Sequence, residues 1–96
     1  MNIINELLFK TDKPGILSIL KNETRHVVAV GLLKDQALAK HKTAIPALLI
    51  VQEGSVEFHM NGLVSTLNRL DTFIIPIEVE YEVIGKEEKN IFLIIK

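Results

Sequence analysis

The three histidines are the side chains of this 96-residue sequence best suited to chemistry near neutral pH. An imidazole can transfer a proton or anchor a ligand there, whereas most other side chains keep one charge state. His41 is the candidate for such a role. The alternative is a polar side chain that only hydrogen-bonds to a neighbour. His26 and His59 have charged neighbours, so we expect both to face solvent.

Other chemistries are excluded by the residue content. Cysteine is absent, which rules out disulfides, zinc–thiolate sites and thiol nucleophiles. No serine–histidine–aspartate order, glycine-rich phosphate loop or carboxylate pair stands out in a supporting context. The 11 basic and 12 acidic residues are spread along the chain, so no basic block is present for nucleic acid. The apolar runs are too short to span a bilayer and the N-terminus lacks a signal-peptide pattern, so we expect a cytoplasmic protein.

The direction of His41 depends on the strand expected over residues 37–43. One face of that strand carries Ala37, Ala39, His41 and Thr43, and the opposite face carries Leu38, Lys40 and Lys42. Since lysine side chains prefer water, the sequence predicts that the His41 face points inward. The small alanines on that face would leave room for a ligand or accommodate larger neighbours.

A meander of three strands follows, over residues 47–51, 55–60 and 63–67. Asn61-Gly62 joins the last two strands, and both residues tolerate the positive φ of a type I′ turn. The strand over 55–60 alternates cleanly, with Val56, Phe58 and Met60 predicted inside and Glu57 and His59 outside.

Further short strands are expected over 16–20, 25–33, 72–75, 81–84 and 91–95. Eight or nine short strands at even spacing, with no long helix, indicate an all-β sandwich or barrel in one domain, 1–96. The first ten residues are ambiguous. Ile3, Ile4, Leu7 and Leu8 lie at helical spacing, but the segment could also be extended.

The middle of the chain resembles the cupins, which are small double-stranded jelly-roll barrels. Their first motif is glycine, five residues, His-x-His, three or four residues, glutamate, six residues, glycine. Over residues 35–54 the positions are taken by Asp35, His41-Lys42-Thr43, Ala47 and Gly54. The spacing is kept without a gap.

The second cupin motif is glycine, five residues, Pro-x-Gly, two residues, histidine, three residues, asparagine. Over residues 70–85 the positions are taken by Leu70, Pro76-Ile77-Glu78, Tyr81 and Gly85. The two motifs cover about half of the chain. The resemblance implies a single antiparallel jelly-roll β-barrel.

The resemblance also bears on metal binding. Cupins that bind a metal hold it with two histidines, a glutamate and a third histidine, and only His41 remains here. Thr43, Ala47 and Tyr81 take the other positions, and a neutral hydroxyl, a methyl group and a phenol are poor ligands for a divalent ion. We therefore expect no metal and no other cofactor. Tyr81 either directs its hydroxyl into a cavity or fills the space that a metal would have taken.

Six residues are predicted to surround one cavity or one packed cluster. These candidate ligand-binding residues are His41, Thr43, Ala47, Phe58, Phe73 and Tyr81. Three functions are compatible with them: a metal-free protein that binds a small, mostly apolar molecule, an enzyme that uses His41 and Tyr81 or an atypical metal site, and a non-catalytic dimeric interaction module. The first is favoured, and an enzyme is less expected than a binding protein.

Self-association is predicted from the surplus of apolar residues. The segments 25–33, 47–51 and 91–95 are apolar on both strand faces, yet a barrel has only one interior. Leu48 and Ile50 must therefore point outward together with residues of the neighbouring strands. A self-complementary apolar patch is most often closed by a two-fold axis, so we expect a homodimer.

Overall fold

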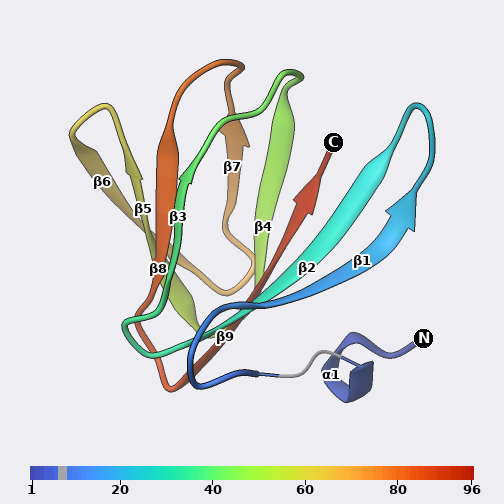
Figure 1. The fold of residues 1–96 in the computed structure, drawn as a ribbon. Coiled ribbons are helices and arrows are strands. Elements are labelled where there is room, and N and C mark those ends of the chain that lie inside the picture. The colour runs from blue at the N-terminus through green and yellow to red at the C-terminus, as the bar shows by residue number, and fades with distance from the viewer. Residues whose placement is uncertain (7–8) are drawn as a thin grey trace.

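Over the residues that the structure describes, the fold consists of nine strands and one helical turn. The computed structural model describes residues 1–6 and 9–96 (Figure 1). The elements are α1 (Ile3–Glu6), β1 (Gly15–Lys21), β2 (His26–Leu33), β3 (Ala37–His41), β4 (Ala47–Glu53), β5 (Ser55–Met60), β6 (Leu63–Asn68), β7 (Thr72–Ile75), β8 (Tyr81–Gly85) and β9 (Lys89–Ile95). In the part of the chain so described, no helix is long and apolar enough to cross a membrane.

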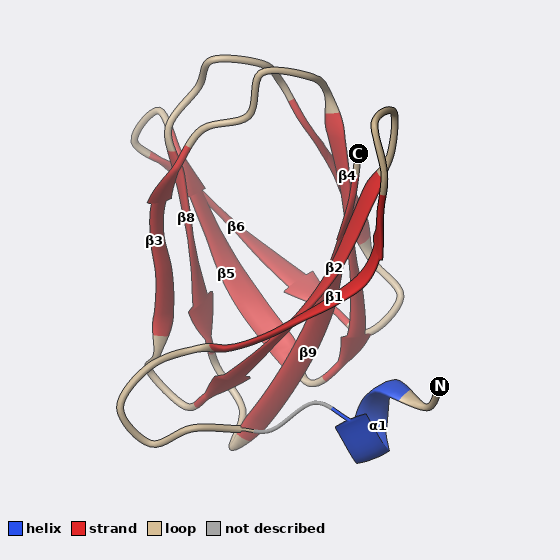
Figure 2. Cartoon of the chain, turned by 45° about the vertical axis from the view of Figure 1, so that its right-hand side comes forward, coloured by secondary structure: helices blue, strands red, loops and turns tan. Residues whose placement is uncertain are grey.

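The strands form two antiparallel sheets that face each other (Figure 2). The five-stranded sheet has the order β1-β2-β9-β4-β7, and the four-stranded sheet has the order β3-β8-β5-β6. The all-β prediction is confirmed, and so is each expected strand to within a few residues. The helical reading of the N-terminus holds for Ile3 and Ile4, while Leu7 and Leu8 lie outside the described residues.

The core lies between the two sheets and draws on both. Its largest fully buried side chains include Phe58 and Phe92, one from each sheet. In β5 the prediction is confirmed, because Val56 and Phe58 are buried while Glu57 and His59 lie on the other face. The alternating pattern therefore places the strands correctly wherever the pleat is regular.

The prediction for β3 is wrong in part. Leu38 is buried, whereas Ala39 and His41 are exposed. The register shifts between Leu38, opposite Val83, and His41, opposite Tyr81. Ala39 and Lys40 thus lie opposite the single residue Glu82, so β3 contains a β-bulge, and Lys40 inside it has a φ of 54°. The extra residue lets Leu38 reach the core and still leaves His41 on the side of Tyr81.

Left-handed backbone marks three positions where the cupin motifs have glycine. Asp35, Leu70 and Glu78 have φ values of 68°, 71° and 59°. Residues with a Cβ rarely adopt this conformation, and glycine adopts it freely. The backbone of the motifs is therefore kept at these turns although the glycines are replaced.

Asn90 closes the end of the molecule that is remote from His41, which we call the floor. Asn90 follows four charged residues, Lys86 to Lys89, yet its own side chain is fully buried. Its Oδ1 accepts hydrogen bonds from the backbone N–H of Ser55 (3.0 Å) and Glu87 (3.1 Å). Its Nδ2 donates to the carbonyls of Leu32 (3.0 Å) and Glu87 (2.9 Å). One amide thus links both sheets and saturates its own hydrogen-bonding capacity.

Candidate functional site

A pocket of about 200 Å³ opens at the end of the molecule opposite the floor. We call it the mouth pocket. Its walls are apolar. The five-stranded sheet contributes Ile16, Val28, Val30 and Ile94, and β3 of the other sheet contributes Leu38. These side chains reach it because β1, β2 and β9 present alternate residues to the interior at this end.

Four polar residues complete the lining of the mouth pocket: His26, His41, Tyr81 and Lys96. The end of the chain is held beside β2, because the backbones of His26 and Lys96 bond to each other in both directions at 3.4 and 2.9 Å. The ring centroids of His41 and Tyr81 are 6.2 Å apart. The pocket therefore combines apolar walls with several hydrogen-bond donors at its edge.

Aromatic rings fill the interior next to the mouth pocket. Tyr81 stacks on Phe58 with centroids 5.4 Å apart and an interplanar angle of 19°. Phe58 in turn contacts Phe73 at 4.5 Å. Tyr81 and Phe58 are buried, and Phe73 is half-buried against the same cluster. The three aromatic rings thus form one packed group between the sheets.

The six predicted site residues divide into three groups. His41 and Tyr81 line the mouth pocket, and Phe58 and Phe73 pack beside Tyr81. Ala47 is buried in the same core cluster, while Thr43 is buried with its hydroxyl donating to the Ile45 carbonyl at 2.6 Å.

Two residues of the pocket edge were not predicted. His26, expected to be solvated, is half-buried and lines the mouth pocket, so that expectation is wrong. It shares the alternating inner face of β2 with Val28 and Val30, a pattern that was readable in the sequence. Lys96 follows Ile94 by two positions and shares its face in the same way.

Burial raises the pKa of the Tyr81 phenol above its ordinary value of 10.0. A phenol with a raised pKa stays protonated at neutral pH. Tyr81 can therefore donate or accept a hydrogen bond at the pocket, but it is a weak base and a weak metal ligand there.

The donor set does not suit the metal of the cupins. Among residues 1–6 and 9–96, no three histidine, aspartate or glutamate side chains come together in a group that could hold a metal ion. His41 is the single imidazole at the four motif positions, the Thr43 hydroxyl is engaged with a carbonyl of its own loop, and Ala47 has no donor atom.

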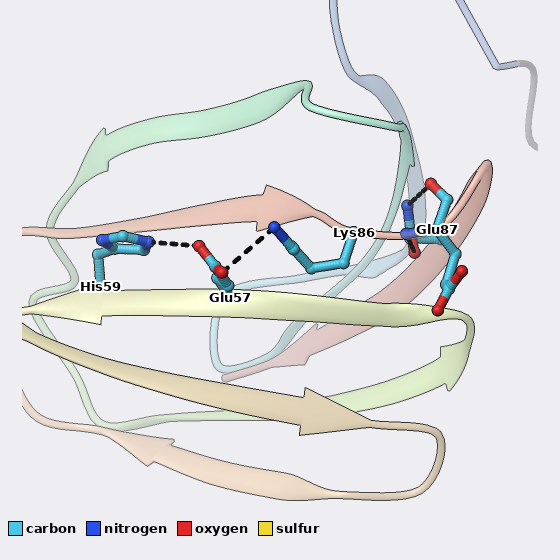
Figure 3. Close-up of polar contacts among 5 residues, drawn as sticks. Glu57, His59, Lys86 and Glu87 are labelled. Carbon is cyan, nitrogen blue, oxygen red and sulfur yellow. Dashed lines mark hydrogen bonds and ion pairs between the residues drawn. The ribbon is translucent and has the colours of Figure 1, made fainter.

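A polar cluster lies on the outer face of the four-stranded sheet (Figure 3). Glu57 sits between His59 and Lys86, with Oε1 3.2 Å from His59 Nε2 and Oε2 3.2 Å from Lys86 Nζ. The hydrogen bond to His59, followed by that to Lys86, holds the pKa of Glu57 below its ordinary value. All three side chains are partly exposed, so the cluster belongs to the surface and contributes little to stability.

The fold is shared with several solved structures. An uncharacterised protein with a double-stranded β-helix domain from Klebsiella pneumoniae is similar with a TM-score of 0.90 at 20% identity, over 99% of this chain and 85% of that one. An RmlC-like cupin from Desulfovibrio desulfuricans is similar with a TM-score of 0.86 at 20% identity, over 99% of this chain and 92% of that one. A cupin superfamily protein from Desulfitobacterium hafniense has a TM-score of 0.83 at 10% identity, over 91% of this chain and 79% of that one.

The sequence itself matches no protein-family model and no curated protein. The likeness therefore rests on structure, where it extends over nearly the whole chain. Together with the two sheets and the left-handed turns at the motif positions, it shows that this chain has the cupin fold.

Proposed function

We propose that this chain is a cytoplasmic protein that binds a small, mostly apolar molecule with a polar head group, without the help of a metal ion. The mouth pocket supports the proposal. It offers about 200 Å³ between apolar walls, and four hydrogen-bonding side chains stand at its edge. Ligand sites are commonly concave and apolar with a few polar groups that fix orientation.

The depth of the site follows from the aromatic packing. Phe58 and Phe73 occupy the interior next to Tyr81, so a ligand would rest on the Tyr81 ring and not pass beyond it. The apolar part would contact Val28, Val30 and Ile94, and the polar head would meet His26, His41 or Lys96. A pocket of this volume suits a molecule of about ten non-hydrogen atoms, below the drug-sized range.

Acid–base catalysis is the alternative function. It is favoured by the position of His41 and Tyr81 on one pocket, 6.2 Å apart. A general base works best when its pKa lies near the operating pH, whereas burial raises the pKa of Tyr81 further away from neutral pH. Binding without turnover is therefore the function we propose.

The test is a titration of isotope-labelled protein with hexanol and with hexanoate, followed by amide chemical shifts. We expect changes at Val28, Val30 and Ile94, which line the pocket. Val28→Phe fills the pocket and should abolish them. Val64→Phe makes the same change on an exposed residue of the other sheet and should leave them intact. Absence of binding, or binding that Val28→Phe does not weaken, would overturn the proposal.

A further inference from the structure

Three basic residues lie side by side along the rim of the mouth pocket. On the five-stranded sheet, Lys21 of β1 lies opposite His26 of β2, and His26 lies opposite Lys96, which follows β9. Residues directly opposite each other in an antiparallel sheet point to the same side. Since His26 and Lys96 line the pocket, Lys21 shares their inner face. We call Lys21, His26 and Lys96 together the basic row.

The side chains below the basic row on β2 and β9 are apolar. Val28 and Ile94 form the next pair, and Val30 and Phe92 form the pair below it. All four belong to the core cluster or pack against it. Ile16, opposite Val30 on β1, lines the pocket and is still 61% exposed, so apolar surface remains uncovered there. The polarity of the pocket thus changes in one direction, from apolar inside to basic at the rim.

The four-stranded sheet adds further hydrogen-bond donors and no acid. His41 lines the same pocket beside Tyr81, whose phenol keeps its proton at neutral pH because burial raises its pKa. Glu80 and Glu82, on either side of Tyr81 in the sequence, line a different pocket. Within the described part of the chain, no aspartate or glutamate is among the residues that line the mouth pocket.

The basic row has a net positive charge. Its two lysine side chains each carry an ammonium group. The main-chain carboxyl group of Lys96 is an acidic group beside them, and its oxygen accepts a hydrogen bond from the His26 N–H at 3.4 Å. One carboxylate against two ammonium groups leaves the rim positive even when His26 is neutral. The rim is therefore complementary to an anion.

The turn between β1 and β2 fixes the backbone next to the basic row. Asn22 Oδ1 accepts hydrogen bonds from the backbone N–H groups of Thr24 (3.0 Å) and Arg25 (2.9 Å). Lys21 and His26, on either side of this turn, are thereby held opposite each other. Figure 2 shows this turn and the end of β9 at the same end of the molecule. A site whose charged groups are already positioned loses less free energy when a ligand orders them.

We propose that the mouth pocket selects an aliphatic carboxylate, whose alkyl chain contacts the apolar walls and whose carboxylate lies at the basic row and His41. The inference rests on the proposed function, because it names the head group of the molecule bound there. Ammonium and imidazole N–H groups donate charge-assisted hydrogen bonds to a carboxylate, and these are roughly twice as strong as neutral ones. An alcohol forms only the weaker contacts, and an alkylammonium ion is repelled by the lysines.

The first test compares hexanoate, hexanol and hexylammonium by amide chemical shifts of the labelled protein at neutral pH and low salt. Hexanoate should bind about tenfold more tightly than hexanol, and hexylammonium more weakly than hexanol. High salt should reduce the preference for hexanoate, since both lysines are at least partly exposed. Hexanol binding within about threefold of hexanoate overturns the inference and leaves the proposed function standing. Absence of binding by all three probes overturns both.

The second test removes charge from the rim. The double variant Lys21→Gln/Lys96→Gln should reduce the preference for hexanoate over hexanol about tenfold. The matched control is Lys34→Gln/Lys86→Gln, which removes the same charge from two exposed residues that follow β2 and β8 near the floor. The control should keep the preference. An unchanged preference in the rim variant, or an equal loss in the control, would overturn the inference, because the charge at the rim would then not select the ligand.

Discussion

Replacement of Asn90 by alanine should be one of the most destabilising changes in this protein. The substitution removes four hydrogen bonds. The Ser55 N–H and the Leu32 carbonyl lie in buried surroundings, where a group without a partner costs about 1–3 kcal/mol. The two groups of Glu87 lie in an exposed turn and can bond to water, so they add little. The expected loss is about 4 kcal/mol, a large part of the 5–15 kcal/mol typical of a domain.

Urea denaturation followed by circular dichroism measures this loss. We expect a lower midpoint with an unchanged slope, since the surface exposed on unfolding stays the same. Asn68→Ala is the matched control, because Asn68 is exposed, and its effect should stay within about 0.5 kcal/mol. A loss below about 1 kcal/mol for Asn90→Ala would refute the reasoning, since it would mean that water hydrogen-bonds to the Ser55 N–H and the Leu32 carbonyl in the variant.

Three further predictions concern other parts of the molecule. Leu70→Gly should stabilise the fold by about 0.5–1 kcal/mol, because it relieves a left-handed residue with a φ of 71°, whereas the control Leu63→Gly in strand β6 should destabilise it by a similar amount; a loss of stability in both would contradict this. Tyr81→Ala should lower the free energy of unfolding by about 3–5 kcal/mol. In the wild type, stability should decline as pH rises above 10.0, because the Tyr81 phenol ionises first in the unfolded chain. The phenolate absorbance of this single tyrosine should therefore appear at a higher pH in the folded than in the unfolded protein. Lys86→Gln should raise the pKa of Glu57 toward 4.5 in a carbon-detected titration. The ionised Glu57 side chain stabilises the fold above pH 4.5, this contribution is lost as pH falls through the folded pKa, and it should be smaller in the variant. An unchanged pKa of Glu57 would refute the ion pair.

The sequence predicts much of this fold because most strands keep a regular pleat. In β5 the alternation of Val56, Glu57 and Phe58 is read directly as inside, outside, inside. The turn at Asn61-Gly62 follows in the same way from two residues with positive φ. Fold class and strand order along the chain depend on such local rules.

The site was less predictable because it depends on contacts between distant strands. Asn90 lies among lysines and glutamates, so its segment reads as a solvated turn, and only the carbonyl of Leu32, 58 residues away, explains its burial. His26 follows a charged arginine and was assigned to solvent, although its strand face belongs to the pocket. The ligand role of the six candidate residues stays a prediction.

The bulge in β3 has a consequence for how the chain tolerates changes in length. In a regular strand, the loss of one residue turns every later side chain to the opposite face. Between Leu38 and His41 the chain already holds one residue more than β8 requires. Deletion of Lys40 would restore a simple pleat, remove a left-handed residue, and keep Leu38 and His41 on the same side. This stretch can therefore shorten by one residue without moving the pocket lining, whereas the same deletion inside β4 would expose its core residues.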